Sequence, residues 1–354
     1  MNFSELETRV AEVIARSAKS GALSESEFNE TAVAIYQFQR ENNLPYRQFC
    51  EYSGAPATIT DWRAIPTVPT SAFKHAALRT FGEEETVATF RTSGTTGEGY
   101  GTHYFRSLAL YESSILQGWK ALNIPQLPQV ILTQRPADAP HSSLVHMMQT
   151  LSKLNAPGRE QVWCISKDGS LDVAGLRAAA QSGPVLLLGT ALAFLHLFET
   201  LGGEALPLQP GSIAMETGGY KGTGRTLSKA ELYAMFREKL ALDFDAIWNE
   251  YSMTELSSQW YTHGLGRPHF GPPWARALVL DPTTSREVED GAQGVIRLFD
   301  LANVGSVLAI QTQDLAIRRG NGFELLGRDP NAIPRGCSRS ADELLSGQAR
   351  QSRY

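Results

Sequence analysis

The sequence has few of the features that assign a chain to the disulfide-stabilised, membrane-spanning or nucleic-acid-binding classes. Only three cysteines occur in 354 residues, and this odd, widely separated set predicts reduced thiols in a cytoplasmic setting. The net charge of −5 comes from 32 basic and 37 acidic side chains scattered along the chain, so we expect no nucleic-acid partner. No apolar run is as long as a membrane span and the N-terminus is polar, so we expect neither membrane insertion nor export.

What the chain does have is a regular alternation of short apolar runs with helical patterns. Short, continuously apolar strands that alternate with helices form parallel sheets covered on both faces. The sequence therefore predicts an α/β fold with mostly parallel sheets flanked by helices. After about residue 274 the pattern changes to short strands separated by turns, which predicts a small β-rich subdomain. The expected organisation is an α/β core over residues 1–273, a β-rich subdomain with the start of a hinge over 274–337, and a polar tail over 338–354.

The boundaries of these elements follow from periodicity and capping residues. Ser24 with Glu27, and Ser228 with Glu231, have the spacing of a capping box and predict helix starts. Pro66 and Pro69 exclude a continuous helix over 61–74. Helices are expected at 3–18, after Ser24, and at 108–122, 142–154, 171–181, 192–201 and 228–240. Strands are expected at 130–132, 162–165, 185–188, 212–216, 244–248, 277–280, 295–299, 307–310, 315–317 and 323–326.

A loop rich in glycine and hydroxyl groups, residues 92–102, lies between two strand-forming runs. Its four glycines, at 94, 97, 99 and 101, permit positive φ angles and let backbone amides approach a ligand, which suits a phosphate. The Walker pattern fails, because Tyr100 stands where that pattern has lysine. From the residues alone, this loop is either a phosphate-binding loop or a surface turn of small residues.

Three further loops follow predicted strands and carry glycines, cations or carboxylates. In an open α/β sheet, ligands bind outside the carboxyl ends of the strands, so such loops are where a site is expected. Each loop alone is structural more often than functional. They cover residues 215–225, 249–255, and 311–315 with 327–329 shortly after.

Taken in order, the loops resemble the motifs of the adenylate-forming superfamily of acyl-activating enzymes. Residues 93–97 match its phosphate-binding motif, and 251–255 match its aromatic-Gly-x-Thr-Glu motif with Ser252 in place of glycine. Residues 312–315 match its Thr-Gly-Asp-Leu motif, and Gly327-Arg328 the start of its hinge. The resemblance is closer to the acyl-protein synthetases of bacterial luminescence and their relatives in antibiotic pathways, through residues 73–74, 140–144, 217–221 and 335–338.

This resemblance implies the large N-terminal domain of the adenylate-forming fold, with the mobile C-terminal domain absent. It implies activation of a fatty or aromatic carboxylic acid by ATP and Mg²⁺ to an acyl-adenylate, followed by transfer of the acyl group to a thiol, a protein or another acceptor. The implied catalytic residues are Thr254, Glu255, Lys221 and Cys337, and Glu255 would also ligate Mg²⁺. The implied nucleotide contacts are Thr92, Ser93, Gly94, Thr95, Thr96, Gly97, Gly218, Gly219, Tyr251, Ser252, Asp314 and Arg328. His141, Ser142 and Trp260 would border the acyl pocket.

The resemblance also gives individual roles. Thr254 would bond the α-phosphate, Tyr251 would lie against the adenine, and Asp314 would accept both ribose hydroxyls with support from Arg328. Gly218 and Gly219 would allow close backbone approach. The structural alternatives are that Tyr251 belongs to the core and that Glu255 is a carboxylate at a helix start.

Two departures from the superfamily pattern keep a second function open. The phosphate loop usually continues with proline and lysine, but Glu98-Gly99-Tyr100 follows here, so Lys221, Arg225, Arg91 or His103 would have to supply the positive charge. The chain also stops soon after its hinge motif. The protein is therefore either an acyl-activating enzyme or a non-catalytic or low-activity binding or carrier protein for an acyl or aromatic intermediate.

The cysteines and two histidines carry separate expectations. Cys337 is either the acyl acceptor implied by the acyl-protein branch or an idle thiol. Cys50 and Cys164 have apolar neighbours in the sequence and are expected to be structural. His263 and His269 lack a set of metal-ligating neighbours and are expected to be loop residues.

Overall fold

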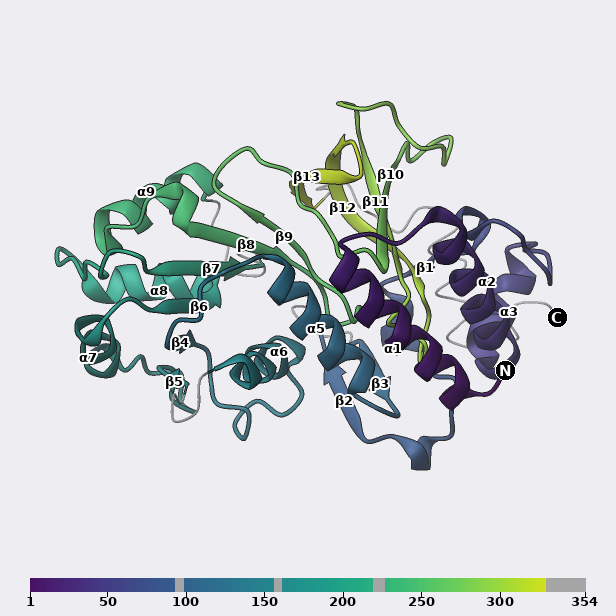
Figure 1. Cartoon of the computed structure of the whole chain (residues 1–354), viewed down its shortest axis with the longest axis horizontal. Coiled ribbons are helices and arrows are strands. Elements are labelled where there is room, and N and C mark those ends of the chain that lie inside the picture. The colour runs from purple at the N-terminus through teal and green to yellow at the C-terminus, as the bar shows by residue number, and fades with distance from the viewer. Residues whose placement is uncertain (93–98, 156–160, 219–226, 329–354) are drawn as a thin grey trace. The chain divides into compact units, whose positions relative to one another are not determined.

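The computed structural model describes residues 1–92, 99–155, 161–218 and 227–328 (Figure 1). These residues divide into two compact units. The first unit contains residues 1–121, 253–258 and the described residues from 270 onward. The second unit contains residues 122–252 and 259–269.

A six-stranded sheet forms the second unit. Its neighbouring strands are parallel, except that the last strand pairs antiparallel with the one before it. The mostly parallel α/β fold expected from the sequence is therefore confirmed here. In spatial order the strands are β5 (Val162–Trp163), β4 (Gln129–Leu132), β6 (Leu186–Thr190), β7 (Ile213–Thr217), β8 (Ile247–Tyr251) and β9 (Trp260–His263).

The helices of this unit begin at residues with capping side chains. Ser142, Asp172, Thr190 and Ser228 each accept a hydrogen bond from a backbone amide in the first turn. The apolar faces of α7, α8 and α9 share one core with the strands, in which Phe194 and Phe236 have ring centroids 4.5 Å apart. The helices are α6 (Ser143–Leu151), α7 (Val173–Ser182), α8 (Ala191–Leu201) and α9 (Lys229–Leu240), with 3₁₀ turns η3 (Ser152–Leu154) and η4 (Phe244–Ala246).

The first unit holds a mixed five-stranded sheet, a separate hairpin and helices. The sheet has the order β1 (Val68–Pro69), β12 (Ala309–Arg319), β11 (Gln293–Asp300), β10 (Ala275–Leu280), and β13 (Gly322–Arg328) also pairs with β12. The hairpin is β2 (Ala88–Arg91) with β3 (Thr102–Phe105). The helices are α1 (Phe3–Ser20), α2 (Glu25–Asn42), α3 (Leu44–Tyr52), α4 (Ala72–His75) and α5 (Ala109–Ala121), with η1 (Trp62–Ala64) and η2 (Glu83–Glu85).

Aromatic contacts hold the helices of the first unit to its sheet. Trp62 makes edge-to-face contacts with Phe28 of α2 at 5.1 Å and with Phe299 of β11 at 4.7 Å. Helix α1 lies alongside α5 (Figure 1). No helix among the described residues is long and apolar enough to cross a bilayer.

The structure differs from the sequence expectations at four elements. Residues 307–310 and 315–317 were expected to form two strands, but they belong to the single strand β12. The polar run from Gln311 to Asp314 breaks the apolar pattern, while the backbone of β12 continues pairing with β11 and β13 on its two sides. The strand expected at 244–248 is a 3₁₀ turn followed by β8, so Asn249, Glu250 and Tyr251 lie in a strand and not in a loop. Helix α3 and strand β9 were not anticipated.

Candidate functional site

The β2–β3 hairpin presents the ends of the glycine-rich loop. The amide of Thr92 donates to the carbonyl of Gly101 at 2.9 Å, and the hydroxyl of Thr92 accepts from the amide of Gly101 at 2.9 Å. A Cβ at Gly101 would meet the Thr92 side chain at 3.1 Å, so this closure requires a small residue. Thr92 therefore joins the two ends of the loop.

The 253–258 segment, which contains Thr254 and Glu255, is held through its backbone. The carbonyl of Thr254 accepts from Nδ1 of His103 at 2.8 Å, and the carbonyl of Glu255 accepts from Nδ2 of Asn303 at 2.8 Å. The amide of Ser257 donates to Oδ2 of Asp300 at 2.8 Å. Three neighbouring backbone groups are thus fixed by side chains of the hairpin, of the last residue of β11 and of the turn that follows it.

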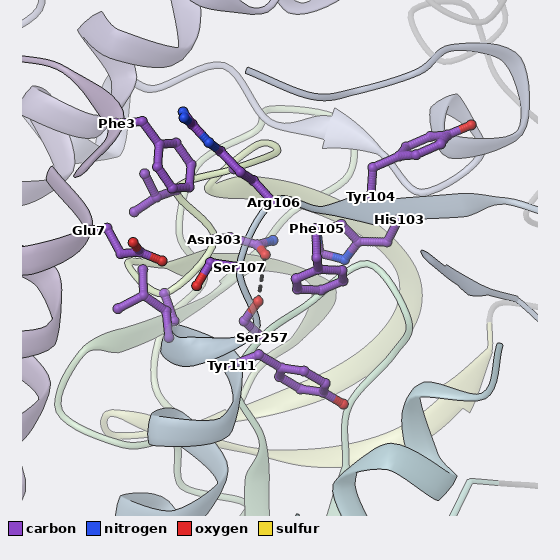
Figure 2. Close-up of a pocket in the computed structure, with 14 residues that line it drawn as sticks. Phe3, Glu7, His103, Tyr104, Phe105, Arg106, Ser107, Tyr111, Ser257 and Asn303 are labelled. Atoms are coloured by element: carbon purple, nitrogen blue, oxygen red, sulfur yellow. Dashed lines mark hydrogen bonds between the residues drawn. The ribbon is translucent and has the colours of Figure 1, made fainter. Parts of the chain in front are cut away.

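A small pocket lies beside this segment. Figure 2 shows Ser257 and Asn303 facing each other in it, joined by a hydrogen bond of 2.8 Å, with His103 beside Phe105. Arg106 at the pocket is already engaged, because it pairs with Glu85 at 2.6 Å. The pocket is lined by Phe3, Glu7, residues 103–107, Leu110, Tyr111, Ser257 and residues 302–305.

Glu255 is buried and Thr254 is partly buried. Neither lies in a helix, so the structural alternative of Glu255 as a carboxylate at a helix start is wrong. The described residues contain no group of three or more His, Cys, Asp or Glu side chains able to hold a metal ion. Mg²⁺ usually binds one or two carboxylates together with substrate phosphates, so a single buried carboxylate fits a magnesium ion that arrives with a nucleotide.

Asp314 and Arg328 are brought together by the sheet. They are direct cross-strand partners in the antiparallel pair of β12 and β13, which places residues 14 positions apart side by side. The guanidinium of Arg328 donates to Oε1 of Gln313, the neighbour of Asp314. Gln313 therefore orients Arg328. The sequence analysis assigned no role to Gln313, which stands at the glycine position of the Thr-Gly-Asp-Leu motif.

In the second unit, Tyr251 and Trp260 are cross-strand partners at the antiparallel edge of the sheet. Both rings are buried, Trp260 to 1% exposure. His269, which was expected to be a loop residue, is also buried, and its ring lies 6.2 Å from that of Tyr251. His269 nevertheless lies in the connection between β9 and β10, as expected of a loop residue, and its burial follows from chain folding after β9, which periodicity does not show. His263, in contrast, lies in β9, so the expectation that it is a loop residue is wrong.

A buried polar network lies next to these aromatic rings. Oε1 of Glu216 accepts from Asn249 at 2.8 Å and from the hydroxyl of Tyr233 at 3.2 Å. Oδ1 of Asn249 accepts from Lys229 at 2.8 Å and from His269 at 2.6 Å. Burial raises the pKa of Glu216 to about 7 and lowers that of Lys229. Sequence reasoning missed this network, although polar residues inside an apolar strand were the available signal.

Glu250 and Thr217 form a second polar pair at the ends of β8 and β7. The hydroxyl of Thr217 donates to the carboxyl group of Glu250, and burial raises the pKa of Glu250. Gly218 follows with φ +75°, which only glycine adopts readily. No atom of the described residues would lie within 4 Å of a Cβ there, so the φ angle is the feature that favours glycine at this position.

His141 and Ser142 lie at the start of α6. His141 is exposed, and the hydroxyl of Ser142 accepts from the amide of Val145 at 3.2 Å as the helix N-cap. The remaining expected site residues lie outside the described ranges. They are Ser93, Gly94, Thr95, Thr96, Gly97, Gly219, Lys221 and Cys337, and Arg225 also lies outside.

Two expectations about single side chains are settled by burial. His103 does not supply the missing positive charge of the phosphate loop, because burial lowers its pKa to about 4 and keeps the ring neutral near pH 7. Cys50 and Cys164 are buried, as expected of structural thiols, and burial raises their pKa to about 11 and about 12.

Comparisons with known proteins give a distant relationship and a fold. No protein-family model matches the chain. The chain is 24% identical over 328 residues to the long-chain-fatty-acid–luciferin-component ligase of Vibrio harveyi, covering 88% of this chain and 86% of that protein. It is 24% identical over 336 residues to the protein of the same name from Aliivibrio fischeri, with the same 88% and 86% coverage.

Comparison with solved structures shows the fold. An open conformation of 2-hydroxyisobutyryl-CoA ligase, in complex with 2-HIB-AMP and CoA, matches with a TM-score of 0.63 at 14% identity, over 88% of this chain and 77% of that one. The chain is therefore a distant homologue of the luciferin-component ligases, and it has the fold of the large N-terminal domain of adenylate-forming enzymes.

Proposed function

We propose that this protein is an AMP-forming ligase that uses ATP and Mg²⁺ to activate a fatty or aromatic carboxylic acid and passes the acyl group to a thiol, a protein or another acceptor. The observation that carries the proposal is the distant homology to two ligases that act on long-chain fatty acids, over 88% of the chain. The anchored backbone of Thr254 and Glu255 supports it, because transition-state stabilisation needs preorganised groups.

In the proposed reaction, a carboxylate oxygen of the acid attacks the α-phosphorus of ATP, and the bond from that phosphorus to the pyrophosphate oxygen breaks. Negative charge builds up on the phosphate oxygens. Thr92 and residues 93–97 would bind the phosphates, Thr254 would donate to the α-phosphate, and Glu255 would ligate Mg²⁺. Lys221 would add positive charge during the attack. Mg²⁺ would neutralise part of the phosphate charge.

The remaining assignments concern the nucleoside and the acid. Asp314 would accept from both ribose hydroxyls with Arg328 beside it, which agrees with their cross-strand pairing. Tyr251 would lie against the adenine, and Ser252, Gly218 and Gly219 would line the nucleotide. Trp260, His141 and Ser142 would border the acid.

ATP–pyrophosphate exchange against a panel of fatty and aromatic acids tests the proposal. We expect exchange with at least one acid, and a loss of about 100-fold or more in Glu255→Gln and Thr254→Val, since removing one transition-state contact typically has this effect. Glu289→Gln, at an exposed carboxylate of the first unit, is the matched control and should retain wild-type exchange. Folded protein that exchanges with no acid would contradict the proposal.

A second function, binding or carriage of an acyl or aromatic intermediate without catalysis, is favoured by one observation. Tyr100 occupies the lysine position of the phosphate loop, and the neighbouring His103 is neutral and does not replace that charge. Titration calorimetry separates the two functions. A carrier would bind the acid tightly without ATP and release no pyrophosphate, whereas an activating enzyme would release pyrophosphate when both are present.

The proposed acyl acceptor within the chain is Cys337. After incubation with ATP and a substrate acid, intact-mass measurement should show one acyl adduct, which Cys337→Ser removes. An adduct that persists in Cys337→Ser would exclude this residue as the acceptor, while leaving the activation step intact.

A further inference from the structure

We propose that His103 is a positioning residue, which fixes the backbone of Thr254 and Glu255 against the β2–β3 hairpin. The inference rests on the proposed function, because Thr254 and Glu255 are the groups assigned there to the α-phosphate and to Mg²⁺. His103 itself would contact neither nucleotide nor acid. It would act through the main chain of the 253–258 segment.

The hydrogen bond between His103 and Thr254 has a defined direction. A carbonyl oxygen only accepts, so Nδ1 of His103 must carry the proton in its 2.8 Å bond to the Thr254 carbonyl. His103 lies in β3, whose partner strand β2 continues directly into Thr92. The bond therefore joins the strand that closes the glycine-rich loop to the backbone that carries Thr254 and Glu255.

The surroundings of His103 hold its ring in this one state. Only 2% of the residue is exposed, and its ring lies 4.1 Å from that of Phe105 and 5.7 Å from that of Phe73. These two rings restrict rotation of the imidazole. Burial lowers the pKa of His103 to about 4, so a neutral ring protonated at Nδ1 is the state near pH 7.

The rest of the segment is anchored from a different part of the chain. Asn303 binds the carbonyl of Glu255, and Asp300 binds the amide of Ser257. Asp300 is the last residue of β11 and Asn303 follows that strand, so neither belongs to the hairpin. His103 is thus a residue through which the hairpin positions the carbonyl of Thr254, next to Glu255, while Asp300 and Asn303 position other backbone groups of the segment.

Two substitutions separate positioning from simple packing. The Nδ2 of asparagine stands at the same distance along the side chain as Nδ1 of histidine, so His103→Asn retains a donor to the Thr254 carbonyl. His103→Leu fills the space without a donor. We expect His103→Leu to lower kcat for ATP–pyrophosphate exchange by about 30-fold with the KM for the acid nearly unchanged, because small displacements of reacting groups have effects of this size. His103→Asn should recover kcat to within about fivefold of wild type, and Glu289→Gln should match wild type.

Calorimetric binding of Mg·ATP distinguishes failure of this inference from failure of the proposed function. If wild-type protein exchanges with no acid but binds Mg·ATP, the proposed activity fails. In that case, Mg·ATP binding that is roughly tenfold weaker in His103→Leu and restored in His103→Asn would still support the positioning role. Equal behaviour of the two folded variants in both assays would overturn it. Wild-type protein that neither exchanges nor binds Mg·ATP would overturn both.

A spectroscopic measurement covers the case in which His103→Leu does not fold. In ¹⁵N-labelled wild-type protein at pH 7, the His103 ring should show the neutral tautomer protonated at Nδ1. Comparison with His103→Asn assigns the signal. A neutral ring protonated at Nε2 alone would exclude the bond to the Thr254 carbonyl and overturn the inference.

Discussion

Replacing Glu216 with glutamine should change how the stability of this protein depends on pH. Glu216 lies in β7 with 2% of its surface exposed, and burial raises its pKa from 4.5 to about 7 despite opposing contributions from Lys229, Tyr233 and Asn249. Because the folded-state pKa is the higher one, the folded protein binds more protons than the unfolded chain between these two values. Glu216 therefore favours folding most below pH 4.5, and this contribution is lost as the pH rises through 7.

The size of the effect follows from the two pKa values. A tenfold change in an equilibrium constant corresponds to about 1.4 kcal/mol, so a pKa raised from 4.5 to about 7 corresponds to about 3 kcal/mol of unfolding free energy. Roughly 2.5 kcal/mol of this is expected between pH 5 and pH 8. Glutamine retains an oxygen that accepts from Tyr233 and Asn249, so Glu216→Gln removes the titration while keeping these bonds.

Urea denaturation of wild type and Glu216→Gln at several pH values, followed by circular dichroism, measures this difference. The unfolding free energy of wild type minus that of the variant should fall by about 2.5 kcal/mol from pH 5 to pH 8. Glu41→Gln, at an exposed carboxylate of α2, is the control for loss of one surface charge. A difference that stays constant within about 0.5 kcal/mol would refute a raised pKa at Glu216.

Three further measurements address the rest of the structure. Asp300→Ala should lower the unfolding free energy by about 3 kcal/mol or more, because Asp300 is fully buried and accepts from Ser257, Ser258 and Ala302; a loss below about 1 kcal/mol would contradict these bonds. Gly294→Ala should lower the unfolding free energy by at least about 2 kcal/mol, since its Cβ would lie 2.4 Å from the Leu280 carbonyl oxygen. Gly118→Ala in α5, with open space around it, should instead raise the unfolding free energy by about 0.5–1 kcal/mol. Cys50 and Cys164, whose pKa values are about 11 and about 12, should react with a thiol reagent at pH 8 far more slowly in folded than in urea-unfolded protein, and rapid labelling in folded protein would contradict their burial.

Local patterns in the sequence predicted most helices and strands, because their causes are local. The N-caps at Ser24 and Ser228 are both present. The apolar run at 130–132 lies in the parallel strand β4, and the run at 185–188 enters the parallel strand β6 at Leu186. The sequence pattern predicted two strands where the structure has β12 alone, because the polar residues in the middle of β12 interrupt the run of apolar residues. In a strand that pairs with neighbours on both sides, the backbone groups form hydrogen bonds whatever the side chains are. The pattern of apolar residues in the sequence does not show this pairing.

Anchoring of the candidate site was beyond sequence reasoning, because its contacts join distant parts of the chain. Gln39 of α2 donates to the carbonyl of Asn303 at 2.7 Å across 264 positions, and Asn303 in turn binds Glu255. Neither Gln39 nor Asn303 belongs to a recognisable motif. The motif residues themselves were identifiable, since adjacent residues in one loop form a local pattern, but the residues that hold them in place were not.

The replacement of glycine by Ser252 in the 251–255 motif has a physical explanation in this chain. Side chains alternate along β8, so Asn249 contacts Glu216 while Glu250, on the opposite face, contacts Thr217. The side chain of Ser252 also lowers the pKa of the Glu250 carboxyl group, against the larger opposing effect of burial. Glycine at this position would remove that contribution from a buried carboxyl group. Ser252→Gly together with Glu250→Ala should therefore be less destabilising than the sum of the two single changes.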